Sequence, residues 1–243
     1  MLILNKLHRA AGDLLALIFP PTCPVCNATL SEGEQVICNR CRVAMPMTGY
    51  IGRIDNAMER RLWGLVPFVQ ASALYFYIEG SPYRRIIHAF KYGSKWRLAR
   101  DMGEWLGGEM ARSHAFESVD VIVPVPLHPL RRMWRGYNQS EYIARGIAAE
   151  LGVKMDSRTL YRRHYNQSQT TKHSAERWKN VEGIFHLRGS EKFADKHILL
   201  VDDVFTSGAT IISAAQTILA TSPSCRISVA TLATTRHGLG VKS

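Results

Sequence analysis

Residues 198–210 read Ile-Leu-Leu-Val-Asp-Asp-Val-Phe-Thr-Ser-Gly-Ala-Thr. The first four residues are aliphatic, which predicts a buried strand over 198–201. Asp202 and Asp203 end that run, and a turn rich in hydroxyl groups then leads into an apolar helix expected over 209–220. A buried strand that passes through a tight turn into a helix is the unit from which parallel α/β sheets are built.

The same stretch predicts an anion-binding site. Ligands of open α/β sheets bind beyond the carboxyl ends of the strands. A glycine-containing turn at a helix N-terminus directs free backbone N–H groups at an anion. The hydroxyls of Thr206, Ser207 and Thr210 would add donors for a phosphate monoester. Asp202 and Asp203 suit hydrogen bonds to a sugar diol. The pattern therefore predicts a site for a 5-phosphorylated ribose, and the alternative is a capping aspartate beside a polar turn.

Other phosphate-binding motifs are missing from the sequence. It contains neither GxxxxGK[ST] nor a GxGxxG after a strand, which disfavours a P-loop nucleotidase and a dinucleotide-binding fold. The chain from residue 63 onward nevertheless alternates strands with helices, as βαβ units around a parallel sheet flanked by helices do. Further strands are expected over 69–78, 119–125 and 227–232, and helices over 82–90, 96–113 and 140–151. The irregular stretch 161–185 has the length of a functional loop such as a lid.

Four cysteines form two CxxC pairs near the N-terminus. Each pair presents two sulfurs from one tight turn, and eleven residues separate the pairs, which favours tetrahedral zinc ligation. Two disulfides in a secreted protein are the alternative, which the missing secretion signal and the odd fifth cysteine, Cys225, disfavour. A site closed by four sulfurs is structural rather than catalytic. The expected zinc ligands are Cys23, Cys26, Cys38 and Cys41.

Residues 1–62 are expected to form a small N-terminal module, followed by one α/β domain over 63–243. Apolar residues recur at helical spacing over 4–18, which predicts a helix that covers its own protein. An interfacial membrane helix or a partner-binding helix is the alternative. The apolar run 14–19 is too short for a signal peptide, and no stretch approaches the ~20 apolar residues of a membrane span. We therefore expect a cytoplasmic protein.

The chain is basic, with 31 Lys and Arg against 20 Asp and Glu and a formal net charge of +11. Such an excess suggests polyanionic partners such as phosphates, nucleic acid or an anionic membrane surface. Two segments carry most of it, with +6 over 61–100 and +5 over 151–200. Aromatic residues alternate with cations at 83–85, 91–92, 95–97 and 132–135, a pattern that favours single-stranded nucleic acid unless these aromatics are core positions.

These features together resemble one family. Residues 198–210 are similar to the phosphoribosyl pyrophosphate (PRPP) signature of type I phosphoribosyltransferases, and nearly the whole chain resembles the ComF/GntX-like branch, which joins a zinc ribbon to that domain. The resemblance also rests on Phe90-Lys91-Tyr92, on 123–129 (VPVPLHP), on 135–139 (RGYNQ), and on Gln169, Arg177, Asn180, Val181 and Phe185. It implies a type I phosphoribosyltransferase-like α/β fold with a small N-terminal zinc-ribbon module.

The resemblance also implies roles for individual residues. Asp202 and Asp203 would hold the ribose hydroxyls, and Mg²⁺ would bridge pyrophosphate and ribose oxygens. The remaining roles are a 5-phosphate cradle at Thr206, Ser207, Gly208, Ala209 and Thr210, a pyrophosphate loop at Pro124, Val125 and Pro126 with Arg132 and Arg135, and a flexible loop with Arg163, Gln169 and Arg177.

Two functions follow from this resemblance. In the first, an enzyme transfers phosphoribosyl from PRPP to an unknown acceptor. In the second, the protein handles single-stranded DNA during DNA uptake or utilisation, and the binding of PRPP or ribose 5-phosphate is regulatory or vestigial. A weaker third hypothesis is a peripheral membrane adaptor that recruits a competence protein through the N-terminal module. The sequence determines neither the acceptor, nor the catalytic base, nor the oligomeric state.

Overall fold

The computed structural model describes residues 20–93, 95–162 and 183–236. Two compact units divide the chain, residues 1–45 and residues 46–243. The amphipathic segment expected as a helix over 4–18 and most of the expected lid lie outside the described residues. The described helices include none with the length and apolar character needed to cross a bilayer.

In the described part of the N-terminal unit, residues 20–45, turns surround the cysteines. Thr22 and Thr29 form an isolated antiparallel bridge around the first CxxC pair, and the second pair leads into the short helix α2 (Asn39–Val43). Glu34 ties the intervening loop together, because its carboxylate accepts hydrogen bonds from the backbone N–H groups of Ser31 (2.8 Å) and Asn39 (2.6 Å). Cys41 is the buried residue of α2.

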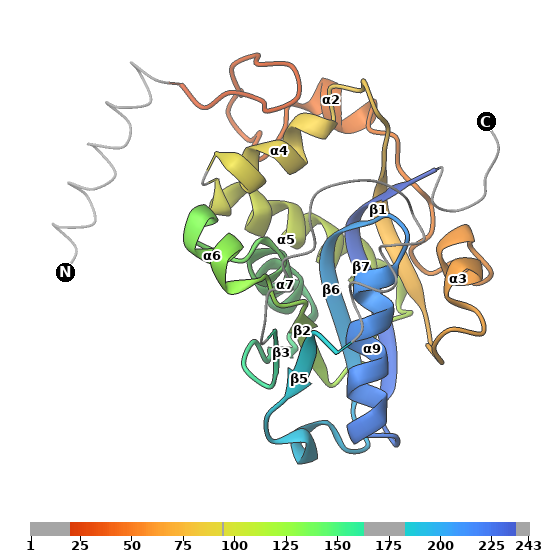
Figure 1. Ribbon diagram of the computed structural model, residues 1–243. Helices are drawn as coiled ribbons and strands as arrows, with labels where there is room; N and C mark the ends of the chain where they lie inside the picture. Colours follow the sequence, from red (N-terminus) through yellow and green to blue (C-terminus); the bar gives the residue numbers. More distant parts are fainter. Residues whose placement is uncertain (1–19, 94, 163–182, 237–243) are drawn as a thin grey trace, which may run out of the picture. The chain divides into compact units, whose positions relative to one another are not determined.

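The larger unit is built on a five-stranded sheet in which every paired neighbour is parallel (Figure 1). Strand β6 (His197–Phe205) is central, and Ile198 to Val201 are completely buried. The predicted parallel α/β fold is thereby confirmed. The sheet order is β1-β7-β6-β2-β3, with β1 (Ala71–Tyr77), β7 (Arg226–Thr235), β2 (Val121–Pro124) and β3 (Lys154–Met155).

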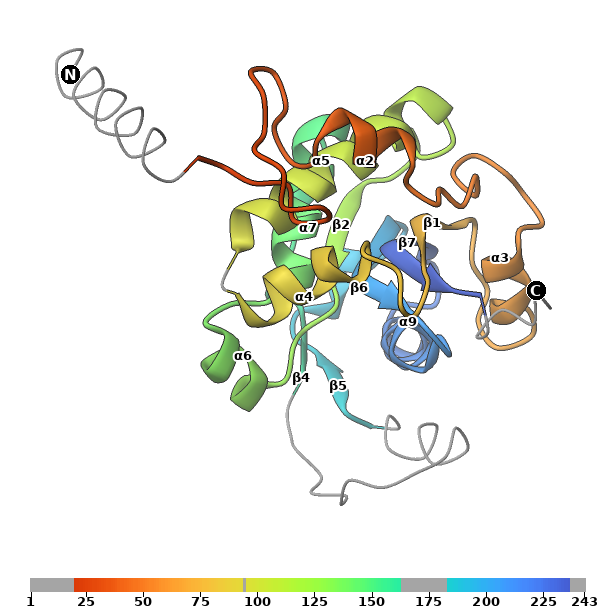
Figure 2. The ribbon, with the colours of Figure 1, turned by 90° about the horizontal axis from the view of Figure 1, so that it is seen from above.

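Helices cover both faces of this sheet (Figure 2). Helix α9 (Ala209–Thr221) lies on one face, where Ile211, Ile212 and Ile218 share a core with Ile198 and Leu200 of β6. The other face carries α7 (Gln139–Leu151), which contacts β6 and β2, and α5 (Trp96–Ser113), which packs on α7. Alternate residues of β6 therefore pack into two core layers, one on each face of the sheet, as expected for a strand that helices cover on both faces.

Helices α5 and α7 approach unusually closely. A Cβ atom at Gly103 of α5 would lie 2.2 Å from the carbonyl oxygen of Ile143, and one at Gly146 of α7 would lie 2.2 Å from that of Arg100. Only glycine fits at either position, because real Cβ atoms do not come within 3.0 Å of backbone. This contact fixes the position of α7, whose first turn contributes to the site described below.

Residues 46–62 belong to the larger unit by their contacts. Asn56 caps helix α3 (Ala57–Leu62) with its side-chain oxygen and donates from Nδ2 to the carbonyl of Ala71 on β1 (2.8 Å). Thr48 donates a hydrogen bond to the carbonyl of Ala73 on the same strand. A boundary between functional domains near residue 62 stays a prediction.

Several elements differ from the expectations. Strand β6 continues to Phe205 because Asp202, Val204 and Phe205 pair with β7, so both carboxylates lie within the strand rather than after it. Helix α4 (Arg84–Tyr92) begins after Ser81-Pro82, which form a turn. The ends of the supposedly irregular stretch 161–185 belong to a short antiparallel pair. Short elements absent from the expectation are α3, α6 (Pro129–Arg135), β3, β4 (Leu160–Arg162), β5 (Phe185–Leu187) and η1 (Ser190–Phe193).

Candidate functional site

A cavity of about 480 Å³ lies in the larger unit, where the carboxyl ends of β6 and β2 meet. Its lining residues come from α4, α6, the first turn of α7, the turn after β2, the ends of β1, β4 and β7, and the end of β6 with the turn into α9. Cations and carboxylates both line it. They are Lys91, Arg131, Arg135, Arg162, Asp202 and Asp203.

Asp202 is held by two hydrogen bonds from the protein. Its Oδ1 accepts from Ser140 Oγ of α7 (2.8 Å) and from the backbone N–H of Asp203 (2.9 Å). Burial, and next to it the charge of Asp203, raise the pKa of Asp202 to about 7, against the lowering effect of those hydrogen bonds. Without a ligand and near neutral pH, this carboxyl group is therefore close to the midpoint of its titration.

Asp203 has a different partner. Lys91, near the end of α4, places Nζ 3.0 Å from Asp203 Oδ2, and both side chains are largely buried. The hydroxyl of Tyr75 on β1 is completely buried and has no hydrogen-bond partner among the described residues. Burial, followed by the negative charge of Asp203, raises the pKa of Tyr75, so this phenol stays neutral. Without a ligand, Lys91 thus neutralises the negative charge of one of the two adjacent carboxylates.

The turn from β6 into α9 has the conformation that its sequence predicts. Gly208 has φ +80° and directly precedes α9, and a Cβ there would come 2.7 Å from Phe205 Cζ. Glycine therefore satisfies both a left-handed backbone and a tight contact. Thr206 and Thr210 line the cavity, whereas Gly208 and Ala209 are buried in the turn. The backbone N–H of Ala209 donates a long hydrogen bond to Ser207 Oγ (3.5 Å). The first turn of a helix leaves further N–H groups without a partner inside the helix, and these can donate to an acceptor here.

The turn after β2 forms the opposite wall. Val125 and Pro126 line the cavity, and Pro124 is the buried last residue of β2. Asn138 braces the turn by donating from Nδ2 to the carbonyl of Val125 (3.0 Å). Of the two arginines expected here, Arg135 lines the cavity. Arg132 does not line it; its largely exposed side chain lies 3.8 Å from Glu141.

Some predicted residues lie outside the described structure, and other cavity residues were given no role from the sequence. Arg163, Gln169 and Arg177 belong to the undescribed segment. Lys91, Gln139 and Ser140 also line the cavity, and the family resemblance implies no role for them. The sequence signal for Lys91 is the family motif Phe90-Lys91-Tyr92, and the signal for Gln139 is the motif 135–139. Arg131 and His88 have no local signal at all.

We predict a pH dependence of stability that arises from Asp202. The folded state keeps this proton to a higher pH than the unfolded chain, because the folded pKa is raised. The stability that protonated Asp202 contributes is therefore fully present below about pH 4 and is lost as the pH rises toward 7. The difference in unfolding free energy between wild type and Asp202→Asn should change by a few kcal/mol over that interval. Chemical denaturation at a series of pH values measures it, and a constant difference would contradict the assignment.

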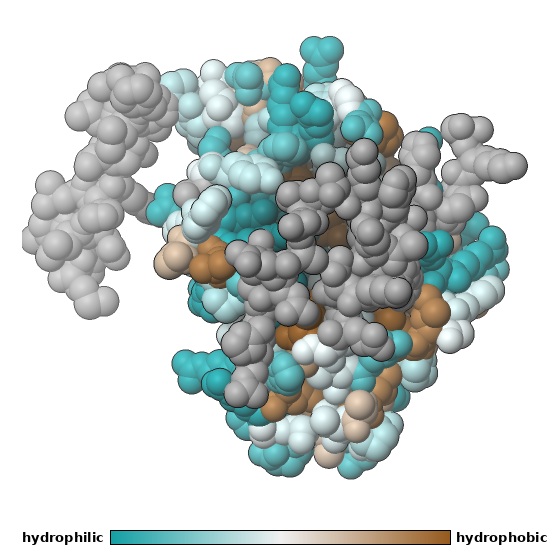
Figure 3. All heavy atoms as spheres, viewed as in Figure 1, coloured by the Kyte–Doolittle hydropathy of each residue, from teal (hydrophilic) through white to brown (hydrophobic). Residues whose placement is uncertain are grey.

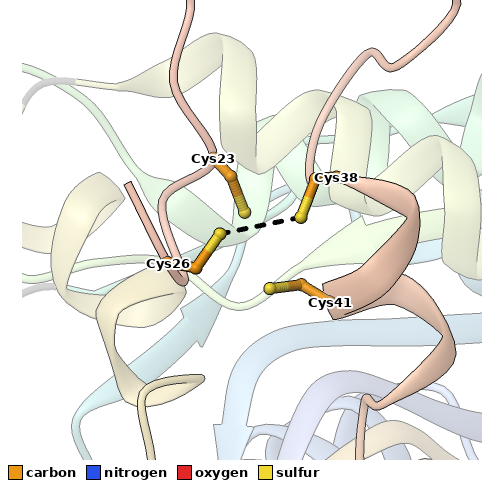
Figure 4. A group of neighbouring side chains, drawn as sticks. All are labelled: Cys23, Cys26, Cys38 and Cys41. Carbon is orange, nitrogen blue, oxygen red and sulfur yellow. Dashed lines mark hydrogen bonds between the residues drawn. The ribbon is translucent and has the colours of Figure 1, made fainter. Parts of the chain in front are cut away.

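The four predicted zinc ligands lie together in the N-terminal unit. The sulfurs of Cys23, Cys26, Cys38 and Cys41 all lie within 4.8 Å of one another, and they point toward a common centre (Figure 4). Zn–S bonds of about 2.3 Å place tetrahedral sulfurs roughly 3.8 Å apart. The separation of 3.6 Å between Cys26 and Cys38 matches that value, and all four thiols are free. The donor set fits structural zinc.

Hydrogen bonds prepare one of these thiols for ionisation. Burial raises the pKa of Cys23, but hydrogen bonds from backbone N–H groups around the two turns outweigh it and lower that pKa to about 7. Burial, and then the neighbouring thiols, raise the pKa of Cys41. The full set of thiolates therefore forms only with a cation present to compensate them.

Known proteins confirm the two-part organisation. Residues 138–243 match the phosphoribosyl transferase domain model, and residues 14–51 match the double zinc ribbon domain. Competence protein F of Haemophilus influenzae is 24% identical over 205 residues, which cover 78% of this chain and 86% of that protein. DNA utilization protein YhgH of Salmonella typhi is 28% identical over 214 residues, which cover 84% and 92%.

A solved structure of hypoxanthine-guanine phosphoribosyl transferase from L. donovani aligns with a TM-score of 0.34 and 17% identity, covering 56% of this chain and 67% of that one. The parallel sheet, the four-cysteine cluster and the two domain matches define a phosphoribosyltransferase-type domain with an N-terminal zinc ribbon. Together with the two relatives, these features support a ComF-like protein of this kind.

Proposed function

We propose that the larger unit binds PRPP with Mg²⁺ and transfers its phosphoribosyl group to an acceptor. One observation carries this proposal. Two adjacent carboxylates on β6 line the same cavity as the threonines of a turn that opens a helix, together with three arginines and a lysine. A sugar diol, a 5-phosphate and a pyrophosphate would each find complementary groups there.

Each part of the cavity lining would bind a different group of PRPP. Asp203 and Asp202 would accept hydrogen bonds from the ribose hydroxyls, and the N–H groups at the start of α9 would donate to the 5-phosphate. Lys91, Arg131 and Arg135 would stabilise the negative charge that grows on pyrophosphate as the bond from C1 to its oxygen breaks and the bond from C1 to the acceptor forms. The carboxylates fit a hard cation, and Mg²⁺ bound with PRPP would neutralise part of the pyrophosphate charge.

The cellular location forms part of the same proposal. Zinc binding needs four reduced thiols, and the cytoplasm keeps thiols reduced. We therefore place the protein in the cytoplasm.

Calorimetric titration of PRPP into the full-length, zinc-loaded protein tests the proposal. We expect binding at one site per chain that weakens strongly when Mg²⁺ is omitted. Pyrophosphate release in the presence of candidate acceptors then tests turnover. An absence of any heat with PRPP and Mg²⁺ would overturn the proposal.

Exposed aromatic residues favour a second candidate function, the binding of single-stranded DNA. Tyr92 is 74% exposed and Trp134 88% exposed, so these two are not core positions, whereas Tyr83 is buried. Arg135 lies 5.5 Å from the ring of Tyr92. Stacking on exposed rings beside cations is how proteins hold single strands without sequence preference. The names of the relatives, Competence protein F and DNA utilization protein, agree with this candidate.

Salt dependence tests the DNA candidate. Phosphate contacts weaken steeply with ionic strength, so the affinity for an oligonucleotide should fall by tenfold or more between about 50 and 200 mM salt. It should survive Asp203→Asn and fall in Trp134→Ala. An affinity that does not change with salt would exclude this mode of binding.

A further inference from the structure

We propose that Gln139 and Arg162 are direct ligands of the pyrophosphate group of PRPP, through Gln139 Nε2 and Arg162 Nε. This inference rests on the proposed function. The observation behind it is that each of these side chains holds a buried N–H donor without an acceptor among the described residues, and that both residues line the cavity.

Gln139 is the first residue of α7 and is 1% exposed. Its Oε1 accepts a hydrogen bond from Arg135 Nη1 at 3.2 Å. A guanidinium can only donate, so this contact fixes which end of the amide is the oxygen and leaves Nε2 as the free end. A buried amide donor without a partner costs free energy, about 1–3 kcal/mol in typical cases. An acceptor atom in the cavity would remove that cost.

Arg162 ends β4 and contributes a second donor of this kind. Its guanidinium lies 5.8 Å from the ring of Phe185 on the paired strand β5, which holds the side chain in place. Burial, followed by the charge of Arg131, lowers the pKa of Arg162, while Asp202 acts in the opposite direction. A buried cation beside another cation is the environment in which an anionic ligand is stabilised most.

The chemistry of this wall selects the ligand group. Gln139 Nε2, Arg162, Arg131 and Arg135 offer only donors, and three of the four residues are cationic. Such a set fits an anion whose exposed atoms are all acceptor oxygens. The 5-phosphate already has the turn at 206–210, at the start of α9, so the group left for this wall is the pyrophosphate on C1. Figure 3 shows hydrophobic residues at the surface in the region of α6, bordered by hydrophilic ones.

Two probes separate this inference from the proposed function. The full-length protein is titrated with inorganic pyrophosphate and, separately, with ribose 5-phosphate, both with Mg²⁺. The variants are Gln139→Met, which keeps the length but has no donor, and Arg162→Lys, which keeps the charge but lacks Nε. Arg112→Met is the matched control, because it removes an exposed positive charge from α5 and Arg112 does not line the cavity.

We expect the Kd for pyrophosphate to rise about tenfold or more in each of the two variants, since hydrogen bonds to charged groups are the strong ones. The Kd for ribose 5-phosphate should stay within twofold, and Arg112→Met should change neither value by more than about threefold. PRPP at saturation should abolish the pyrophosphate heat.

Other outcomes would overturn specific claims. Wild-type affinity for pyrophosphate in both variants overturns the inference and leaves the proposed function standing. Pyrophosphate that still binds to PRPP-saturated protein would occupy a place that PRPP does not, and would overturn the assignment of the two donors to the pyrophosphate group of PRPP. Gln139→Glu keeps the oxygen that Arg135 donates to, so unchanged pyrophosphate affinity in that variant would reduce Gln139 to a positioning residue. Wild-type protein that binds inorganic pyrophosphate but gives no heat with PRPP and Mg²⁺ would overturn the proposed function, and the two donors would then be ligands of pyrophosphate itself only.

Discussion

Asp203→Asn is expected to weaken PRPP binding by about 100-fold or more, the largest effect of any single substitution in the cavity. The carboxylate would accept hydrogen bonds from the ribose hydroxyls, and each such bond to a charged group contributes about 1.5–3 kcal/mol. The substitution also leaves Lys91, now 3.0 Å from Asp203 Oδ2 and largely buried, without its counterion. Calorimetric titration with PRPP and Mg²⁺ measures the change.

Asp202→Asn should have a smaller effect that depends on pH. An asparagine oxygen can still accept the hydrogen bonds from Ser140 and from the backbone of residue 203, so the local fold should persist. Because the pKa of Asp202 is raised to about 7, wild type already carries much of the proton at pH 6. The loss in affinity should therefore be larger at pH 8 than at pH 6.

Asp195→Asn is the matched control for both substitutions. Asp195 is exposed and has φ +57°, a conformation that asparagine adopts readily. The substitution removes one negative charge near the start of β6, at the end of the strand away from the cavity. It should leave the Kd for PRPP within twofold of the wild-type value. An Asp203→Asn variant that binds PRPP as well as this control would show that the carboxylate does not contact the ligand.

The sequence is most informative where the signals are local. The strand, turn and helix at 198–210 occupy consecutive residues, so propensity, capping and glycine placement all point to one structure. Helix α5 begins and ends where its pattern predicts, because it presents a long apolar face to α7. The four cysteines were equally predictable, since ligand spacing in a ribbon is a local property.

The parts that were not predicted depend on contacts between distant residues. Lys91 meets Asp203 and Ser140 meets Asp202 only because α4 and α7 pack beside β6, which no window of sequence records. Strand β6 extends past Val201 because β7 offers partners as far as Thr234. Helix α6 has no buried residue, so it lacks the apolar periodicity that reveals a helix, and its cap at His128 is its clearest signal.

Removal of zinc is expected to unfold the N-terminal unit while the larger unit stays folded. The binding free energy of structural zinc, of the order of 10–16 kcal/mol, is also the folding free energy of a module this small. The described part of the unit has little core besides the cysteines, with Val25, Ile37 and Met45 as its other buried apolar residues. Hydrogen exchange after treatment with a chelator should show lost protection over 20–45 and little change over 71–77 and 197–235.

Cysteine variants sharpen this test. Cys41→Ser should abolish zinc at one equivalent per chain, because three thiolates leave the site open and Cys41 is among its buried ligands. Cys225→Ala is the matched control, since Cys225 lies in the core of the larger unit with α9 and is not one of the four clustered cysteines, so zinc content should not change. Zinc affinity should also fall as the pH drops below 7, because the thiols must lose protons to bind and even Cys23 has a pKa of about 7. Elemental analysis with pH-dependent competition against a chelator measures both effects, and full zinc content in Cys41→Ser would mean that the metal is held by other groups.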